Sequence, residues 1–108
     1  MPQYMLQIAY TPEAWAAMAK DPQDRIEKVR PAVEKMGGKL EHGWLCFGEY
    51  DLVGIVDMPD EVSMAGTAMA FAAGGAIKSQ RTTPLISTAD GVEAMKKAGG
   101  MAYRPPGS

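Results

Sequence analysis

The segment FGEYDLVGIVDMPD, residues 47–60, contains the strongest evidence for the fold. Gly48 suits a tight turn, because glycine adopts the positive φ angles that such turns require. The strand after the turn carries apolar side chains on both of its faces, namely Leu52, Val53, Ile55 and Val56. Since a strand of this kind is buried on both sides, both faces of its sheet must be covered. Pro59-Asp60 then ends the strand and caps a helix.

Apolar periodicity and capping residues divide the rest of the chain into further elements. Residues 4–10 alternate as a strand, and Thr11-Pro12 starts a short helix that ends near Lys20. The elements expected after it are a helix from Asp21-Pro22 to Gly37-Gly38, strands over 39–47 and 51–58, a helix over 61–73, a strand over 76–84 and a helix from Ser87-Thr88 through Lys97. Pro31 falls inside the second helix, where we expect a kink or a one-turn break.

The order of these elements, βαββαβ followed by a helix, predicts an α+β fold of the ferredoxin-like class. Right-handed crossovers place the first and third strands at the centre of a four-stranded antiparallel sheet, with the helices on one face. Because the opposite face of the central strands is also apolar, we expect a second copy of the chain to cover it, in a homodimer or a higher oligomer. The domain is expected over residues 1–98, with a C-terminal tail over 99–108.

The composition limits the functions that the chain can have. A formal net charge of −2 over 108 residues argues against a nucleic-acid-binding surface, which needs a clustered basic face. No apolar run approaches the roughly 20 residues that span a bilayer, and the first residues lack the pattern of a secretory signal. One cysteine, Cys46, allows no intrachain disulfide and fits a reducing compartment. We therefore expect a cytoplasmic protein without nucleic-acid or membrane partners.

With these elements in this order, the chain resembles the GYD-domain family, small bacterial proteins with the dimeric α+β barrel fold. The resemblance runs from Tyr4 to about Ala98. The segments that carry it are Gly37-Gly38-Lys39, Gly48-Glu49-Tyr50-Asp51, Pro59-Asp60 and Arg81-Thr82-Thr83-Pro84-Leu85-Ile86-Ser87, while His42-Gly43-Trp44 departs from the family's pattern. The resemblance implies the fold and the homodimer but no reaction. Proteins that share the barrel include cofactor-independent monooxygenases, lactone isomerases and haem-degrading enzymes.

Tyr50 and Asp51, beside the predicted turn, are the first two candidate site residues. In the structural interpretation, the Tyr50 ring packs against the end of the sheet and the Asp51 carboxylate accepts backbone N–H groups. In the functional interpretation, Tyr50 donates its hydroxyl to a ligand, and Asp51 orients that hydroxyl or acts as a base. Turns often use these residue types for local hydrogen bonds, which favours the structural interpretation.

His42 and Arg81 are the other two candidates. His42 is expected to share a strand face with Leu40, Trp44 and Cys46, where a neutral imidazole could transfer protons; the alternative is an imidazole on an edge strand with solvent or one backbone partner. Arg81 lies on the fourth strand. Its planar guanidinium could bind a carboxylate or enolate, pair with an acidic residue such as Asp51, or protect the sheet edge.

The sequence predicts no bound cofactor or metal. A single histidine and a single cysteine without ligand spacing do not make a standard zinc site. Some barrel relatives bind haem through one axial histidine, so a haem would bind through His42. Cys46 is expected to be a small buried side chain rather than a nucleophile, because no thiolate-stabilising neighbour is evident.

Two hypotheses for the function follow. In the first, a homodimeric barrel binds a small, largely apolar or aromatic molecule between the sheet and the Ala- and Gly-rich helix over 61–73. Catalysis there would be cofactor-independent proton transfer, isomerisation or oxygenation, with His42 or Asp51 as the base and Arg81 or Tyr50 stabilising the oxyanion. In the second, the chain is a non-catalytic structural or regulatory oligomerisation module without a ligand pocket.

Overall fold

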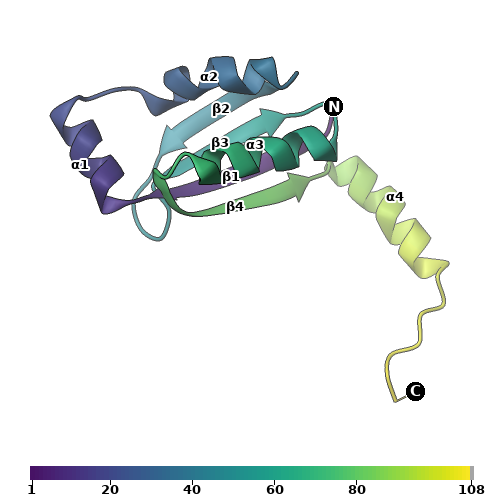
Figure 1. Ribbon diagram of the computed structural model, residues 1–108. Coiled ribbons are helices and arrows are strands. Elements are labelled where there is room, and N and C mark those ends of the chain that lie inside the picture. Colours follow the sequence, from purple (N-terminus) through teal and green to yellow (C-terminus); the bar gives the residue numbers. More distant parts are fainter. Residues whose placement is uncertain (108) are drawn as a thin grey trace.

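The structure is a computed structural model that describes residues 1–107, and its main feature is a four-stranded antiparallel sheet with helices on one face (Figure 1). The elements in chain order are β1 (Gln3–Tyr10), α1 (Pro12–Lys20), α2 (Arg25–Lys35), β2 (Lys39–Leu45), β3 (Leu52–Asp57), α3 (Glu61–Ala73), β4 (Ile77–Leu85) and α4 (Thr88–Gly99). The strand order is β2-β3-β1-β4, so β1 and β3 lie at the centre as predicted. The α+β, ferredoxin-like arrangement is therefore confirmed.

Side-chain caps start three of the helices where the sequence predicts them. In each case an oxygen of the cap side chain accepts a hydrogen bond from the backbone N–H three residues further on. The oxygen–nitrogen distances are 3.1 Å for Thr11, 2.7 Å for Asp60 and 3.0 Å for Ser87. The hydrogen bonds from Ser63 lower the pKa of Asp60, which keeps this cap ionised.

The start of α2 differs from the prediction. Its N-cap is Asp24, whose Oδ1 accepts from the backbone N–H of Glu27 at 3.2 Å, and not Asp21. Of the two possibilities expected at Pro31, the one-turn break is wrong, because α2 continues through this residue. Pro31 is exposed, so water can solvate the Glu27 carbonyl that loses its intrahelical N–H donor.

A bulge in β2 corrects a second prediction. Leu40 pairs with Val56, but the next pair is His42 with Ile55, so Glu41 is an extra residue between them. One extra residue moves every following side chain to the other face of a strand. Leu40 consequently faces the helices while His42 lies on the opposite face, and the prediction that they share a face is wrong.

The core lies between the sheet and the two helices α2 and α3. Its larger cluster of buried side chains comprises Tyr4, Leu6, Val33, Leu40, Val56, Met58 and Met64. A smaller cluster next to the end of β1 comprises Ile8, Tyr10 and Leu52. Val33, Val56 and Met58 are almost completely inaccessible. Burial of each such side chain stabilises the fold by about 1.5–3 kcal/mol.

The other face of the sheet, which we call the open face, is not covered by any helix of residues 1–107 (Figure 1). Its central strands contribute Met5, Val53 and Ile55, which are half-buried, and β2 contributes Trp44, which is 55% exposed. Met5 pairs with Ile55 across β1 and β3, and Val53 pairs with Trp44 across β3 and β2. The apolar side chains therefore form a continuous strip across three strands.

Helix α4 leaves the body of the domain and buries none of its side chains (Figure 1). As a result the radius of gyration is 17.4 Å, whereas a compact chain of this length has a value of about 13 Å. Within residues 1–107, no helix is long and apolar enough to cross a membrane.

The exit of α2 provides a test of the packing between α2 and the β2–β3 pair. A Cβ atom added to Gly38 would lie 2.5 Å from the carbonyl oxygen of Asp57 and 2.6 Å from the Sδ of Met58. We expect Gly38→Ala to lower the free energy of unfolding by about 1–3 kcal/mol, because the backbone of β3 would have to move.

Urea denaturation followed by circular dichroism measures this effect. Gly91→Ala is the matched control, because a Cβ at Gly91 meets open space and alanine is the better helix former. Equal midpoints for Gly38→Ala and the unmodified protein would contradict the packing described for this helix exit.

Candidate functional site

An apolar cavity of about 230 Å³ lies between the sheet and the helices α2 and α3, and we call it the sheet–helix cavity. Its floor is formed by Leu6, Ile8, Leu52 and Gly54 of the central strands. Its walls are formed by Ile26, Val29 and Val33 of α2, by Ala70 and Phe71 near the end of α3, and by Ile77 of β4. The lining therefore resembles that of an apolar ligand pocket more than that of a catalytic cleft.

Small residues create this space. Gly54 is on the helix-facing side of β3, and a Cβ atom there would lie no nearer than 3.4 Å to any atom beyond its chain neighbours. Ala70 and Gly74 at the end of α3 add little volume above it. The prediction that the Ala- and Gly-rich helix over 61–73 leaves room next to the sheet is consistent with this geometry.

Tyr10 and Arg25 are the residues with polar side chains in the described lining. Tyr10 is only 7% exposed, and this burial raises the pKa of its hydroxyl. The positive charge of Arg25 and hydrogen bonding to it oppose that rise. The hydroxyl therefore stays protonated near neutral pH and is available as a hydrogen-bond donor.

The carboxylate of Asp51 fixes the end of the sheet next to Tyr10. Its Oδ2 accepts from the backbone N–H of Tyr10 at 2.9 Å and from the indole Nε1 of Trp15 at 3.2 Å. The Trp15 ring meets the Tyr10 ring edge to face, with 5.6 Å between the ring centroids. Asp51 thus accepts one backbone N–H, as the structural interpretation expects, together with one indole N–H.

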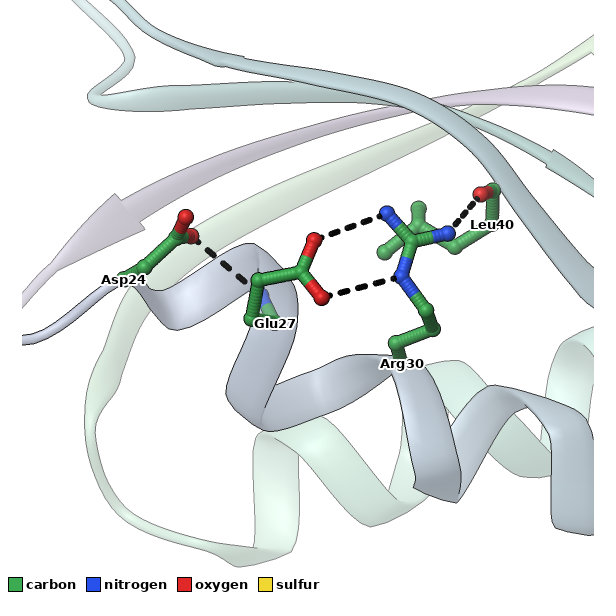
Figure 2. Close-up of polar contacts among 4 residues, drawn as sticks. All are labelled: Asp24, Glu27, Arg30 and Leu40. Atoms are coloured by element: carbon green, nitrogen blue, oxygen red, sulfur yellow. Dashed lines mark hydrogen bonds and ion pairs between the residues drawn. The ribbon is translucent and has the colours of Figure 1, made fainter.

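Arg30 holds α2 against β2 at the bulge, as Figure 2 shows. Its Nη1 donates to the carbonyl oxygen of Leu40 at 2.6 Å. Its Nη2 and Nε donate to the two carboxylate oxygens of Glu27, at 3.1 Å and 3.4 Å. The hydrogen bond to Glu27 raises the pKa of Arg30, so the residue stays charged. Arg30 and Glu27 thus help to set the position of α2, which forms one wall of the cavity.

The four predicted site residues do not line the sheet–helix cavity. His42 lies on the open face, where its ring stacks on Trp44 at 5.7 Å between centroids, and it borders an open groove between β2 and the α1–α2 connection. Arg81 is exposed and pairs with Gln7, so it also lies on the open face. His42 and Arg81 are on the two outer strands, which lie about 14 Å apart in a sheet with strands spaced about 4.8 Å.

Tyr50 lies in the loop before β3 and is half-buried. Its carbonyl oxygen accepts a hydrogen bond from the Sγ of Cys46 at 3.2 Å. Cys46 is only partly buried, and it closes the loop locally. Of the four predicted site residues, Tyr50 and Asp51 lie together because they are neighbours in the sequence, while His42 and Arg81 lie elsewhere. The four residues do not form one site within the chain, and their catalytic roles stay predictions.

Sequence reasoning missed Tyr10 and Arg25 as cavity residues. Tyr10 lies in the strand predicted over residues 4–10, but the position of its hydroxyl could not be derived from the sequence. Arg25 is the first residue of α2. It lies four residues before the cavity residue Val29, and this helical spacing is the signal in the sequence that places the two side chains on one side of α2. Within the described part of the chain, no three His, Cys, Asp or Glu side chains are grouped as a metal site would require.

The fold and the cavity define a ferredoxin-like α+β domain with an apolar pocket beneath its helices. The sequence matches the family of the GYD domain over residues 4–98, and the chain belongs to this family. A comparison with curated proteins finds no match.

The two hydrogen bonds of Asp51 lead to a stability prediction. Asp51→Ala leaves the Tyr10 N–H without its acceptor, so we expect a loss of about 1–3 kcal/mol in the free energy of unfolding. Asp51→Asn keeps one acceptor oxygen and should lose less. Both are measured by urea denaturation, with the exposed neighbour Glu49→Ala as the control. Glu49→Ala should leave the free energy of unfolding unchanged. If Asp51→Ala also leaves it unchanged, the described hydrogen bonds contribute nothing to stability.

Proposed function

We propose that the protein binds a small apolar or aromatic molecule in the sheet–helix cavity. The observation that carries this proposal is an apolar space of about 230 Å³ beneath α2 and α3. A cavity of about 150 Å³ lined by aliphatic and aromatic side chains binds benzene, whereas pockets for drug-sized ligands start at about 300 Å³. A single aromatic ring or a short alkyl chain therefore matches the available volume.

Binding is the function that this geometry supports best. Cofactor-independent proton transfer, isomerisation or oxygenation needs a base within hydrogen-bonding reach of the bound molecule. His42 and Asp51, the predicted bases, are not among the residues that line the cavity. Catalysis by His42, Tyr50, Asp51 or Arg81 would instead require a ligand outside this cavity.

We also propose that the protein works as a homodimer in the cytoplasm. The supporting observation is the strip of Met5, Val53, Ile55 and Trp44 on the open face, which a second copy would remove from water. Helix α4 supports the same proposal, because its exposed Val92 and Met95 are three residues apart and lie on one side of the helix. A second copy would cover them as well.

Isoleucine methyl groups test ligand binding directly. Ile8, Ile26 and Ile77 line the cavity, whereas Ile55 and Ile86 do not. In protein labelled with ¹³C at the isoleucine δ1 methyl groups, we expect added benzene to shift the first three signals and leave the other two unchanged. Gly54→Val fills the cavity floor and should abolish these shifts.

The matched control for the cavity-filling variant is Gly91→Val, which places the same side chain in open space on α4. It should respond to benzene as the unmodified protein does. Absence of any shift in the cavity methyl groups of the unmodified protein would overturn the binding proposal. In that case, a dimer without ligand binding would favour the alternative of an oligomerisation module without a ligand pocket.

Sedimentation equilibrium tests the homodimer. Val53→Glu places a charge in the apolar strip, and we expect it to convert the dimer to a monomer because a buried unpaired carboxylate is costly. Val62→Glu is the control, since Val62 is 81% exposed on α3. It should remain dimeric. A monomer at tens of micromolar unmodified protein would contradict the proposal.

A further inference from the structure

We propose that the molecule bound in the sheet–helix cavity is a small monocarboxylate with an apolar body, and that Arg25 binds its carboxylate. This inference rests on the proposed function and specifies the class of ligand. Its starting observation is the position of Arg25. Together with Ile26 and Leu52, Arg25 borders both the cavity and the open groove between β2 and the α1–α2 connection. Arg25 therefore lies where the cavity meets this open groove.

No ion pair among residues 1–107 neutralises the charge of Arg25 at this opening. Arg25 is the one charged side chain in the described lining of the cavity. The ion pairs of residues 1–107 are Arg30–Glu27, Lys39–Glu41 and Lys96–Glu93. Arg25 takes part in none of them.

The carboxylates near this end of the sheet already have other partners. Asp24 caps α2, where its Oδ1 accepts from the backbone N–H of Glu27. Asp51 accepts from the backbone of Tyr10 and from the indole of Trp15. The positive charge beside the apolar cavity is thus left for an anion that enters from outside.

Hydrogen-bond donors of the right kind are also present. One arm of the Arg25 guanidinium donates to the Oε1 of Gln23 at 2.8 Å. A guanidinium has five N–H groups in a planar fork that matches the geometry of a carboxylate, so further donors remain. Tyr10, close enough to Arg25 for the arginine's charge to act on its pKa, adds a protonated hydroxyl. A carboxylate oxygen can accept from both residues.

The two halves of the site then select one kind of molecule. The cavity accepts an apolar group, and the cation at its opening favours a negative charge at one end of that group. A neutral ligand would leave the partly desolvated guanidinium without a charged partner, whereas a carboxylate forms charge-assisted hydrogen bonds with it. A dicarboxylate would place its second charge among apolar side chains and is disfavoured.

Phenylacetate and phenylacetamide are suitable probes, because they share shape and size and differ in charge. Titrations are followed by the δ1 methyl signals of Ile8, Ile26 and Ile77. We expect the unmodified protein to bind phenylacetate about tenfold more tightly than phenylacetamide.

Substitutions of Arg25 test whether this residue causes the preference. Arg25→Met should bind the two probes with nearly equal affinity. Arg25→Lys keeps the charge but not the planar fork of the guanidinium, and it should retain part of the preference. Lys28→Met removes the same charge from an exposed site on the same helix and should keep the full preference.

Each outcome bears on a separate statement. Equal affinities for the two probes in the unmodified protein would overturn the role of Arg25 while the binding proposal stands. If Lys28→Met and Arg25→Met both lose the preference for phenylacetate over phenylacetamide, the role of Arg25 is also overturned, because the overall charge of the protein would then cause the preference. If neither probe nor benzene shifts the cavity methyl signals, the binding proposal itself fails. Should Arg25→Met not fold, Arg25→Lys and the two probes on the unmodified protein still decide the question.

Discussion

Helices α2 and α3 pack against one face of the central strands, and this packing shapes both sides of the sheet. These two helices bury the helix-facing side chains of β1 and β3, but they do not meet closely over Gly54. The space that remains is the sheet–helix cavity. The same arrangement leaves the apolar side chains of the open face without a covering element in residues 1–107. The cavity and the proposed dimer surface are thus two consequences of one packing arrangement.

The bulge at Glu41 determines how β2 takes part in this arrangement. Before the bulge, Leu40 points into the core, and its carbonyl oxygen accepts the hydrogen bond of Arg30. After the bulge, Gly43 faces α2, where a Cβ atom would overlap the side chain of Ile26. His42 and Trp44 are turned to the open face as a stacked pair. A single inserted residue therefore moves the only histidine away from the cavity and into the surface that the proposed dimer would cover.

The elements of the fold were predictable because their signals are local. Thr11, Asp60 and Ser87 each cap a helix by accepting from the backbone three residues further on. Apolar alternation identifies β1, and apolar residues on both faces identify β3, without reference to the rest of the chain. The start of α2 was misplaced because Asp21-Pro22 and Asp24 are both acceptable caps. The choice between them depends on how α2 packs. The bulge was missed because alternation alone does not show an extra residue in a strand.

Local sequence patterns and the handedness of crossovers are sufficient to predict the order of the elements, the central positions of β1 and β3, and the family. Which polar groups meet depends instead on tertiary packing. Tyr10 and Arg25 come from β1 and α2 and converge at the cavity opening, whereas His42 and Arg81 end on the far side of the sheet. Local propensity does not predict these positions, because a register shift of one residue moves a strand side chain to the other face of the sheet, and packing sets the register.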